Sequence, residues 1–380
     1  MKIKSVKPWL IGAKSRDWVI VKVETDDDLT GIGEATLEGR SATVAAAVEE
    51  MSRYFLNKDP LQIERHFQHI YRGQFWRGGA VLMSAFSGIE QALWDIAGKA
   101  LSQPVNRLLG GPVRDRVKVY ANGWLGGAST ISEAVSRAEC AVKRGFHALK
   151  LPGFAAMADL SGTASYLWAL DCARAVRNAL GPQIDLMVDM HGRGTPAEAI
   201  SLVKEYETLN IYFLEEPVGP ENVAALAEVK HHSALRIATG ERLCTRFGFR
   251  EVLERRAADV IQPDLCHCGG ILEAKKIAAM AETYYVDVAP HNPNGPVSTA
   301  ASVEFSLATQ NFAMLEFMMD DAPWREEVFP DAYDLRNGYM LPRQRPGLGV
   351  EMNEAAARRY PPTGVDLPVC HLEDGTIAEW

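Results

Sequence analysis

Hydrophobic and polar positions alternate along the first 37 residues in the two-residue rhythm of β-strands. Segment 18–25 alternates and is rich in β-branched residues, 26–31 carries turn signals, and 31–34 begins a return strand. Gly31 and Gly33 lie inside this hairpin and lack the third glycine of a dinucleotide-binding loop. The pattern therefore predicts a hairpin and no nucleotide site.

A helical period replaces the alternation between about residues 41 and 101. Two helical faces are marked by apolar residues, namely Ala45, Val48, Met51 and Tyr54, then Met83, Phe86, Ile89, Leu93 and Ile96. An aromatic and basic loop, 74–79, separates them. Strands followed by helices predict an α+β capping domain over residues 1–112.

Residues 113–318 show a third pattern, in which short apolar strands alternate with helices. Eight strands are expected, at 117–120, 148–151, 185–190, 211–214, 236–239, 260–262, 286–289 and 313–315. Helices are expected between them, for example at 134–144, 167–180, 196–209, 223–230 and 270–283. Eight parallel strands close a barrel, whereas a doubly wound open sheet would normally begin with a glycine-rich turn, which is absent. We therefore expect an α/β fold with a (β/α)8-type barrel, that is, a modified TIM barrel.

Residues 319–380 lose this rhythm and are rich in proline, glycine and acidic residues. Asn337-Gly338 is a hairpin signal, and 345–349 is typical of a loop. We expect this C-terminal segment to pack back on the capping domain and complete it.

Composition narrows the function classes. The chain has 380 residues, of which 47% are hydrophobic and 23% charged, and its net charge of −9 argues against a nucleic-acid or anionic membrane surface. No apolar run approaches the roughly 18 residues of a membrane span, and the N-terminus begins as a strand, so a cytoplasmic location is expected. Six cysteines without a framework spacing, including those of Cys266-His267-Cys268, are expected to be reduced thiols.

Three successive predicted strands end in an acid, at Asp189, Glu215 and Glu241. In a parallel barrel these ends lie side by side at the catalytic face. Clustered carboxylates repel one another unless a cation lies between them or their pKa values rise. An all-oxygen ligand set suits Mg²⁺ better than Zn²⁺, so we predict a magnesium site; three separate helix caps are the alternative.

The next two strands end at Asp264 and His291, and an Asp beside a His orients the imidazole and raises its basicity. His191 is expected to share the strand face of Asp189, because side chains alternate along a strand. Strand two carries Lys150, and strand eight ends in Glu316.

These residues resemble the enolase superfamily, mandelate racemase branch, and so do segments 92–99 and 108–111 of the capping domain. Segments 189–193, 240–242, 262–265 and 289–291 resemble the galactonate dehydratase group and related sugar-acid dehydratases. The resemblance covers nearly the whole chain. It implies Mg²⁺, a small-molecule sugar acid as substrate, a homo-oligomer, and removal of the proton α to a carboxylate to give an enediolate.

The expected roles follow from the resemblance and the residues together. Asp189, Glu215 and Glu241 would bind the metal; His291, backed by Asp264, would be the base; His191 would protonate a departing β-hydroxyl, and the product would be a 2-keto-3-deoxy sugar acid. Lys150 and a protonated Glu316 are candidates for hydrogen bonds to the substrate carboxylate. His191 has the alternatives of metal ligand or spectator, and Glu316 that of a solvated acid.

One departure from the family pattern favours elimination over racemisation. Racemases of this branch carry Lys-x-Lys on strand two, whereas this chain has Lys150-Leu151-Pro152, and Pro152 has no proton to transfer. Pro152 also replaces the acid expected there in the galactonate dehydratase group, which leaves the substrate open; Met190, the segment 154–166 and the neutral Asn292 are further candidates for altering the pocket. An epimerase or cycloisomerase, or a non-catalytic sugar-acid binding protein, are the alternatives.

Loops of the capping domain are expected to close over the barrel and select the substrate. Glu38, Arg40, Trp76 and Arg77 are the candidates, with the arginines binding hydroxyls or a distal carboxylate. Such contacts would separate aldonates, such as galactonate or gluconate, from aldarates. Two surface arginines are the alternative.

Overall fold

The computed structural model describes residues 1–14, 16–154, 162–364, 367, 369–371 and 374–378. Its N-terminal unit is an antiparallel sheet of β1 (Ile3–Gly12), β2 (Asp17–Thr25) and β3 (Thr30–Glu34). The helices that follow are α1 (Ser41–Phe55), α2 (Ile63–Tyr71), α3 (Ala80–Ala100) and α4 (Val105–Leu108). The predicted hairpin and helices of this unit are present.

Strand β2 contributes to two cores, because its successive side chains point to opposite faces. Val19, Val21 and Val23 are buried in a cluster with residues of α1 and α3. Trp18 and Ile20 belong to the cluster that contains the barrel core. The capping sheet therefore packs on helices with one face and toward the barrel and C-terminal segment with the other.

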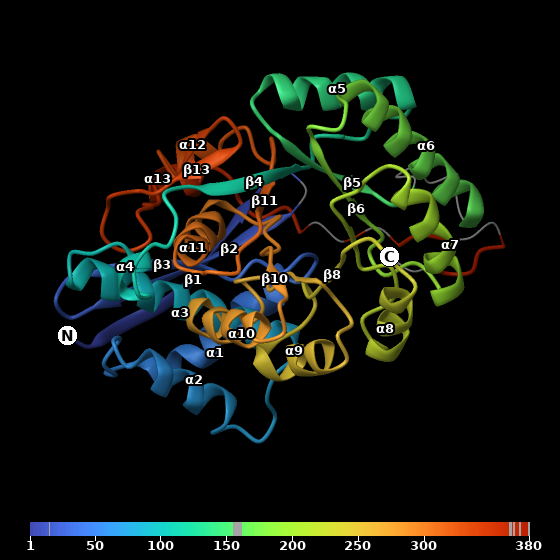
Figure 1. Cartoon of the computed structure of the whole chain (residues 1–380). Coiled ribbons are helices and arrows are strands. Elements are labelled where there is room, and N and C mark those ends of the chain that lie inside the picture. Colours follow the sequence, from blue (N-terminus) through green and yellow to red (C-terminus); the bar gives the residue numbers. More distant parts are fainter. Residues whose placement is uncertain (15, 155–161, 365–366, 368, 372–373, 379–380) are drawn as a thin grey trace.

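The second unit is a closed barrel of eight parallel strands (Figure 1). They are β4 (Val117–Asn122), β5 (Ala148–Pro152), β6 (Asp185–Asp189), β7 (Phe213–Glu215), β8 (Ile237–Thr239), β9 (Val260–Ile261), β10 (Asp287–Val288) and β11 (Leu315–Met318). Strand β11 pairs with β4, and a bridge from Val288 to Phe312 joins β10 to the segment that enters β11.

A helix follows each of the first seven barrel strands: α5 (Ile131–Lys143), α6 (Gly162–Leu180), α7 (Pro196–Glu207), α8 (Val223–His231), α9 (Thr245–Glu254), α10 (Ile271–Glu282) and α11 (Pro296–Leu307). The next helix after the eighth strand, β11, is the four-residue α12 (Arg325–Val328). The prediction of a modified TIM barrel with an N-terminal capping domain is confirmed. Among the described helices, none is long and apolar enough to cross a membrane.

The two-residue period of the strands places a charged layer directly above an apolar one inside the barrel. On β6, Met187 and Asp189 face inward, and on β7 Phe213 and Glu215 do the same. The apolar layer is fully or almost fully buried and consists of Tyr120, Ala148, Met187, Phe213, Ala238, Val260, Ala289 and Met314. It closes the barrel beneath the charged groups, so these groups can be reached only from the carboxyl end of the strands.

The C-terminal segment contacts both units. Its hairpin, β12 (Asp334–Arg336) and β13 (Tyr339–Leu341), turns through Asn337 and Gly338, whose φ angles are 48° and 73°. Strand β13 pairs antiparallel with β4, so the hairpin extends the barrel sheet.

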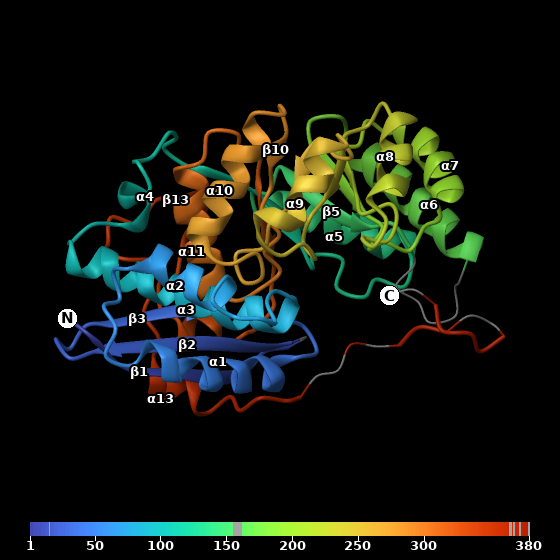
Figure 2. The same cartoon turned by 90° about the horizontal axis from the view of Figure 1, so that it is seen from below.

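The residues beyond this hairpin return to the capping unit as expected. The Leu348 N–H donates to Asp95 Oδ1 of α3 at 2.9 Å, and the Gly12 N–H of β1 donates to the Tyr360 carbonyl, also at 2.9 Å. The short helix α13 (Glu354–Ala357) lies between these contacts in sequence. Figure 2 shows the segment running along the capping sheet.

Buried carboxylates of the capping unit bind the first turns of barrel helices. Glu90 of α3 accepts the backbone N–H groups of Ile271 at 2.7 Å and Leu272 at 2.9 Å, where α10 begins. Helix α10 has no side-chain cap of its own, and free N–H groups at a helix start favour an anion. Burial nevertheless raises the pKa of Glu90 to about 7. Glu34 acts in the same way on the loop before α11.

Candidate active site

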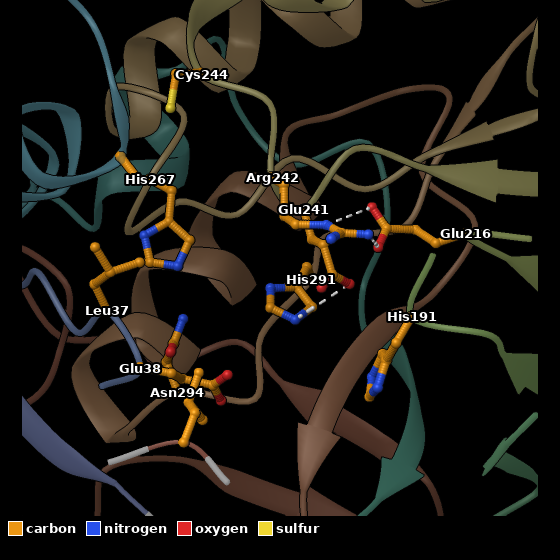
Figure 3. A pocket seen from close by; sticks show the side chains of 12 residues that line it. Leu37, Glu38, His191, Glu216, Glu241, Arg242, Cys244, His267, His291 and Asn294 are labelled. Carbon is orange, nitrogen blue, oxygen red and sulfur yellow. Dashed lines mark hydrogen bonds and ion pairs between the residues drawn. The ribbon is translucent and has the colours of Figure 1, made fainter. Parts of the chain in front are cut away.

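A cavity of about 320 Å³ lies where the carboxyl ends of the barrel strands face the capping unit. Figure 3 shows its side chains converging from several loops. The residues that line it are Leu37, Glu38, Ala80, His191, Glu216, Glu241, Arg242, Cys244, His267, His291, Asn294 and Leu367. Eight segments that are separate in the sequence, from residues 37–38 to residue 367, therefore form one pocket.

Asp189, Glu215 and Glu241 lie together at the base of this cavity. One carboxylate oxygen from each lies within 4.8 Å of the others. Asp189 and Glu215 are direct partners in the register of β6 and β7. Glu241 follows Gly240, whose φ of 136° suits glycine, and a Cβ there would lie 2.7 Å from the Phe249 ring. Three convergent oxygens fit a hard divalent cation.

Lys150 is the ammonium group nearest this cluster. Its Nζ lies 3.0 Å from Asp189 Oδ2, 3.2 Å from Glu215 Oε2 and 2.8 Å from Glu316 Oε1. All four side chains are buried. Burial alone would lower the pKa of Lys150, but the charges of its neighbours, Asp189 first, raise it well above its usual value.

The cluster holds more negative charge than Lys150 balances. Burial and the charge of Asp189 raise the pKa of Glu215 well above its usual value. Burial would also raise the pKa of Asp189, but His191 and Lys150 lower it. A divalent cation among the oxygens would remove this repulsion, which is the physical reason to expect one here.

His291 and Asp264 form the predicted pair. His291 Nδ1 lies 2.7 Å from Asp264 Oδ2. With its Nδ1–H donated to this carboxylate, the ring presents Nε2, which lies 3.6 Å from Glu241 Oε2 and 3.9 Å from Glu316 Oε2. Burial lowers the pKa of His291, but Glu241 and Asp264 together raise it well above its usual value. Nε2 is thus the atom placed to exchange a proton in the cavity.

His191 lies beside the carboxylate cluster, but the alternation of side chains along a strand does not explain its position. Strand β6 ends at Asp189, not at the predicted residue 190, and His191 has a left-handed φ of 48°. The reason is local: the His191 N–H donates to Asp189 Oδ1 at 2.9 Å, an Asx-type turn that competes with the strand. The ring still returns to the cluster, with Nε2 2.9 Å from Asp189 Oδ2.

Glu316 lies inside β11, which continues to Met318, and not after the predicted strand end at 315. Its Oε1 accepts from Asn122 Nδ2 at 2.7 Å, and its Oε2 accepts from the Asn292 N–H at 2.9 Å. Burial would raise its pKa, but Lys150 and His291 lower it. Both Glu316 oxygens act as acceptors in this arrangement, and its hydrogen bond to the substrate carboxylate stays a prediction.

The four predicted substrate-binding residues are placed differently from one another. Glu38 lines the cavity and forms an ion pair with Arg16. Arg40 is exposed at the start of α1, Trp76 is 82% exposed, and Arg77 is exposed in the same loop. These three do not line the cavity in the described structure, and their binding of substrate stays a prediction.

Two charged residues of the cavity wall were not predicted. The Arg242 guanidinium donates to both carboxylate oxygens of Glu216, with Nε 3.3 Å from Oε1. Burial, then Glu241, raises the pKa of Glu216 to about 7, although Arg242 lowers it. Both residues directly follow a predicted metal ligand in sequence, and the second acid of Glu215-Glu216 was the available signal.

His267 is a further cavity residue that the sequence did not assign to the site. Its Nε2 lies 3.4 Å from Asp264 Oδ2, and its Nδ1 lies 2.9 Å from the hydroxyl of Ser84 in α3. Cys266 and Cys268 are free and buried, in agreement with the expected reduced thiols, and the imidazole between them lines the cavity.

Strand β5 ends at Pro152, which is paired with Asp189 in the sheet register. A proton-transferring side chain is therefore absent at this place on the described strand. Of the segment 154–166, which is a candidate for altering the pocket, residues 155–161 lie outside the described residues.

Comparison with known proteins decides the family. Residues 5–110 match the mandelate racemase/muconate lactonizing enzyme N-terminal domain, and residues 133–356 match the family described as enolase C-terminal domain-like. The chain belongs to the mandelate racemase subgroup of the enolase superfamily. Members of this superfamily use a divalent metal, and the three-carboxylate cluster could bind one.

Relatives in this subgroup match over the full chain. The sequence is 40% identical over 371 residues to a D-galactonate dehydratase of Ralstonia pickettii (strain 12J), covering 96% of both chains. It is 40% identical over 389 residues to a D-galactonate dehydratase of Variovorax paradoxus (strain S110), covering 100% of both.

Solved structures agree in fold. A mandelate racemase/muconate lactonizing enzyme-like protein from Roseovarius sp. TM1035 is 33% identical, with a TM-score of 0.90 and 100% of both chains covered. A member of the enolase superfamily from Salmonella Typhimurium is 30% identical, with a TM-score of 0.89, covering 95% of this chain and 98% of the other.

Proposed function

We propose that the protein is a Mg²⁺-dependent sugar-acid dehydratase that converts an aldonate, such as galactonate or gluconate, to a 2-keto-3-deoxy sugar acid. The observation that carries the proposal is the pair of imidazoles, His191 and His291, which line one cavity beside the three-carboxylate cluster. Elimination needs a base and an acid at one site, and the D-galactonate dehydratase relatives support this reaction type.

The first step is removal of the proton α to the substrate carboxylate. His291 Nε2 takes this proton while Nδ1–H stays bound to Asp264, so the C–H bonding electrons move toward the carboxylate and form an enediolate. Held by Asp189, Glu215 and Glu241, a Mg²⁺ ion would stabilise the negative charge that develops. Lys150, whose Nζ lies 2.8 Å from Glu316 Oε1 and 3.0 Å from Asp189 Oδ2, is the proposed hydrogen-bond donor to the substrate carboxylate.

The second step is loss of the β-hydroxyl. The enediolate returns to a carboxylate, the electrons of its carbon–carbon double bond form a new Cα=Cβ double bond, and the β C–O bond breaks; the departing hydroxyl takes a proton from His191 and leaves as water. The resulting enol tautomerises to the 2-keto-3-deoxy acid. His191 lines the cavity beside Asp189, and this position supports its role as the proton donor.

Pro152 supports elimination over racemisation, because a second base on β5 has no counterpart here. An epimerase or cycloisomerase is the second candidate and would not need a leaving-group acid. The presence of His191 in the cavity wall favours dehydration over both.

The pairing of basic groups favours aldonates over aldarates. Among the described residues that line the cavity, the basic groups are Arg242, which pairs with Glu216, and three histidines, each of which lies beside Asp189 or Asp264. Each of these basic groups already has a carboxylate partner. A second substrate carboxylate would therefore find no unpaired cation among them. A neutral polyhydroxyl tail avoids this cost.

The test is a screen of aldonates and aldarates for 2-keto-3-deoxy products, with Mg²⁺ present. Turnover of at least one aldonate, with kcat/KM above that for every aldarate, is the expected result. Failure of every sugar acid would contradict the proposal, and turnover of aldarates alone would contradict the substrate class.

A further inference from the structure

One face of capping helix α3 carries polar groups that contact the loop between β9 and α10. Ser84, Ser87 and Gln91 are spaced by three and four residues and so lie on the same helical face. Their contacts are with His267 Nδ1, 2.9 Å from Ser84 Oγ; the Gly269 N–H, 3.0 Å from Ser87 Oγ; and the Leu265 carbonyl, 2.8 Å from Gln91 Nε2. This loop also contains Asp264, the partner of the proposed base.

Asp264 is fully buried and holds several donors at once. Its Oδ1 accepts the Cys266 N–H at 2.6 Å. Its Oδ2 accepts from His291 Nδ1 at 2.7 Å and Asn294 Nδ2 at 2.9 Å, and it lies 3.4 Å from His267 Nε2. Burial would raise the pKa of Asp264, but His267 and His291 lower it. The carboxylate thus lies between two imidazoles, of which the mechanism uses one.

We infer that His267 is a positioning residue for the Asp264–His291 pair and that Ser84 of the capping unit fixes its orientation, an inference that rests on the proposed role of His291 as base. Ser84 Oγ lies 2.7 Å from the Ala80 carbonyl and 2.9 Å from His267 Nδ1; with the hydroxyl donating to Nδ1, the ring carries its proton on Nε2 and donates it toward Asp264 Oδ2. The ring is then held with Nε2 toward Asp264.

The consequence for the base is geometric. A carboxylate held from both sides cannot turn away from His291, so the Nε2 lone pair keeps its direction into the cavity. A proton-transfer geometry displaced by a fraction of an ångström is costly in rate. The capping unit therefore contributes to base orientation through the Ser84–His267 contact, in addition to covering the pocket.

The matched variants are His267→Gln and His267→Asn. The Gln amide nitrogen can replace Nε2 and keep a donor toward Asp264, whereas the shorter Asn can replace only Nδ1. We expect kcat of the Asn variant to fall roughly 10- to 100-fold with KM changed little, and the Gln variant to recover most of this loss. Exchange of the substrate α-proton in deuterated water should fall in parallel, because it requires the base alone.

Ser84→Ala and Ser87→Ala provide the test from the capping side. Each substitution removes a hydroxyl from the same face of α3. Both serines contact the same loop, but only Ser84 contacts His267. We expect α-proton exchange to fall about five-fold in the Ser84 variant and to stay near wild type in the Ser87 variant. Circular dichroism and thermal midpoints verify that each variant is folded.

Three results would overturn the inference. The His267→Asn variant could exchange the α-proton at the wild-type rate, or it could show a raised KM with unchanged kcat, which would make His267 a binding group. Alternatively, the Ser84→Ala and Ser87→Ala variants could lose equal amounts of α-proton exchange. If the proposed function itself is wrong, the assays give a different result. The wild-type protein would then exchange the α-proton of a sugar acid without forming a 2-keto-3-deoxy product, and the same exchange assay would still rank the variants.

Discussion

His191 Nε2 lies 2.9 Å from Asp189 Oδ2, although the strand that carries Asp189 has already ended. The Asp189 carboxylate also accepts the His191 N–H at 2.9 Å, so one side chain fixes both the backbone turn and the ring. This relationship ties the proposed acid to a proposed metal ligand. The imidazole is consequently held on the metal side of the cavity, where a departing β-hydroxyl would be.

Replacing His191 with Asn should separate the two steps of the reaction. The variant keeps a polar side chain but has no proton to give, so we expect dehydration to fall by roughly two to four orders of magnitude. Exchange of the α-proton in deuterated water should remain within a few-fold of wild type, because His291 is untouched. Product formation and exchange are measured on the same sugar acid. Dehydration near the wild-type rate would show that His191 is not the acid.

Removal of Mg²⁺ should abolish activity, and adding Mg²⁺ should raise the thermal midpoint. Binding to the folded protein alone stabilises it, by about 2.7 kcal/mol at a hundred times the Kd. Glu241→Gln removes one ligand charge and should weaken Mg²⁺ affinity by at least about ten-fold in calorimetry. Glu228→Gln is the control, because this acid is exposed on α8 and outside the cluster. Equal affinities in the two variants would contradict the assigned site.

Much of the fold and part of the site could be predicted because they follow from periodicity. A two-residue alternation specifies which side of a strand faces inward, so Asp189 and Glu215 could be placed beside each other before any coordinates existed. Glu241, Asp264 and His291 could be found because they follow strand ends, although each lies two or three residues beyond the strand. The sequence pattern near each of these residues was therefore sufficient to predict its place at the carboxyl end of a strand.

The remaining features depend on tertiary contacts that a single sequence does not display. The Arg242–Glu216 pair joins two loops, and His267 acquires its surroundings from a helix of the capping unit. The Asn337-Gly338 turn was predictable, but the pairing of its hairpin with β4 was not. Arg40 and Trp76 were chosen by residue type, and in the folded chain both are exposed and neither lines the cavity.

Replacing Glu216 with Gln should shift substrate preference toward aldarates. The substitution leaves the Arg242 guanidinium, 41% exposed in its side chain, without its carboxylate partner in the cavity wall. We expect the ratio of kcat/KM for aldarates to that for aldonates to rise about ten-fold, since a charge-assisted hydrogen bond contributes roughly 1.5–3 kcal/mol. Steady-state kinetics on aldonate and aldarate pairs of one stereochemistry measure this ratio. The double variant that also carries Arg242→Gln is the control and should lose the gain; an unchanged ratio would remove Arg242 from the specificity argument.

Replacing Glu90 with Gln should flatten the dependence of stability on pH. Burial raises the pKa of Glu90 from its ordinary value of 4.5 to about 7, so between these values the folded protein holds a proton that the unfolded chain has lost. The free energy of unfolding therefore falls as pH rises through this window and levels off above it. Without the carboxyl group, the free energy of unfolding should fall less steeply with pH. The difference is at most the contribution of one proton, ~1.4 kcal/mol per pH unit. Urea unfolding across the window measures the slope.

Glu304 is the matched case, because burial also raises its pKa to about 7. The Glu304→Gln variant should flatten the dependence of stability on pH by a similar amount, and the double variant should flatten it twice as much. A slope identical to wild type in the Glu90 variant would mean that this carboxyl group is ionised in the folded protein throughout the window.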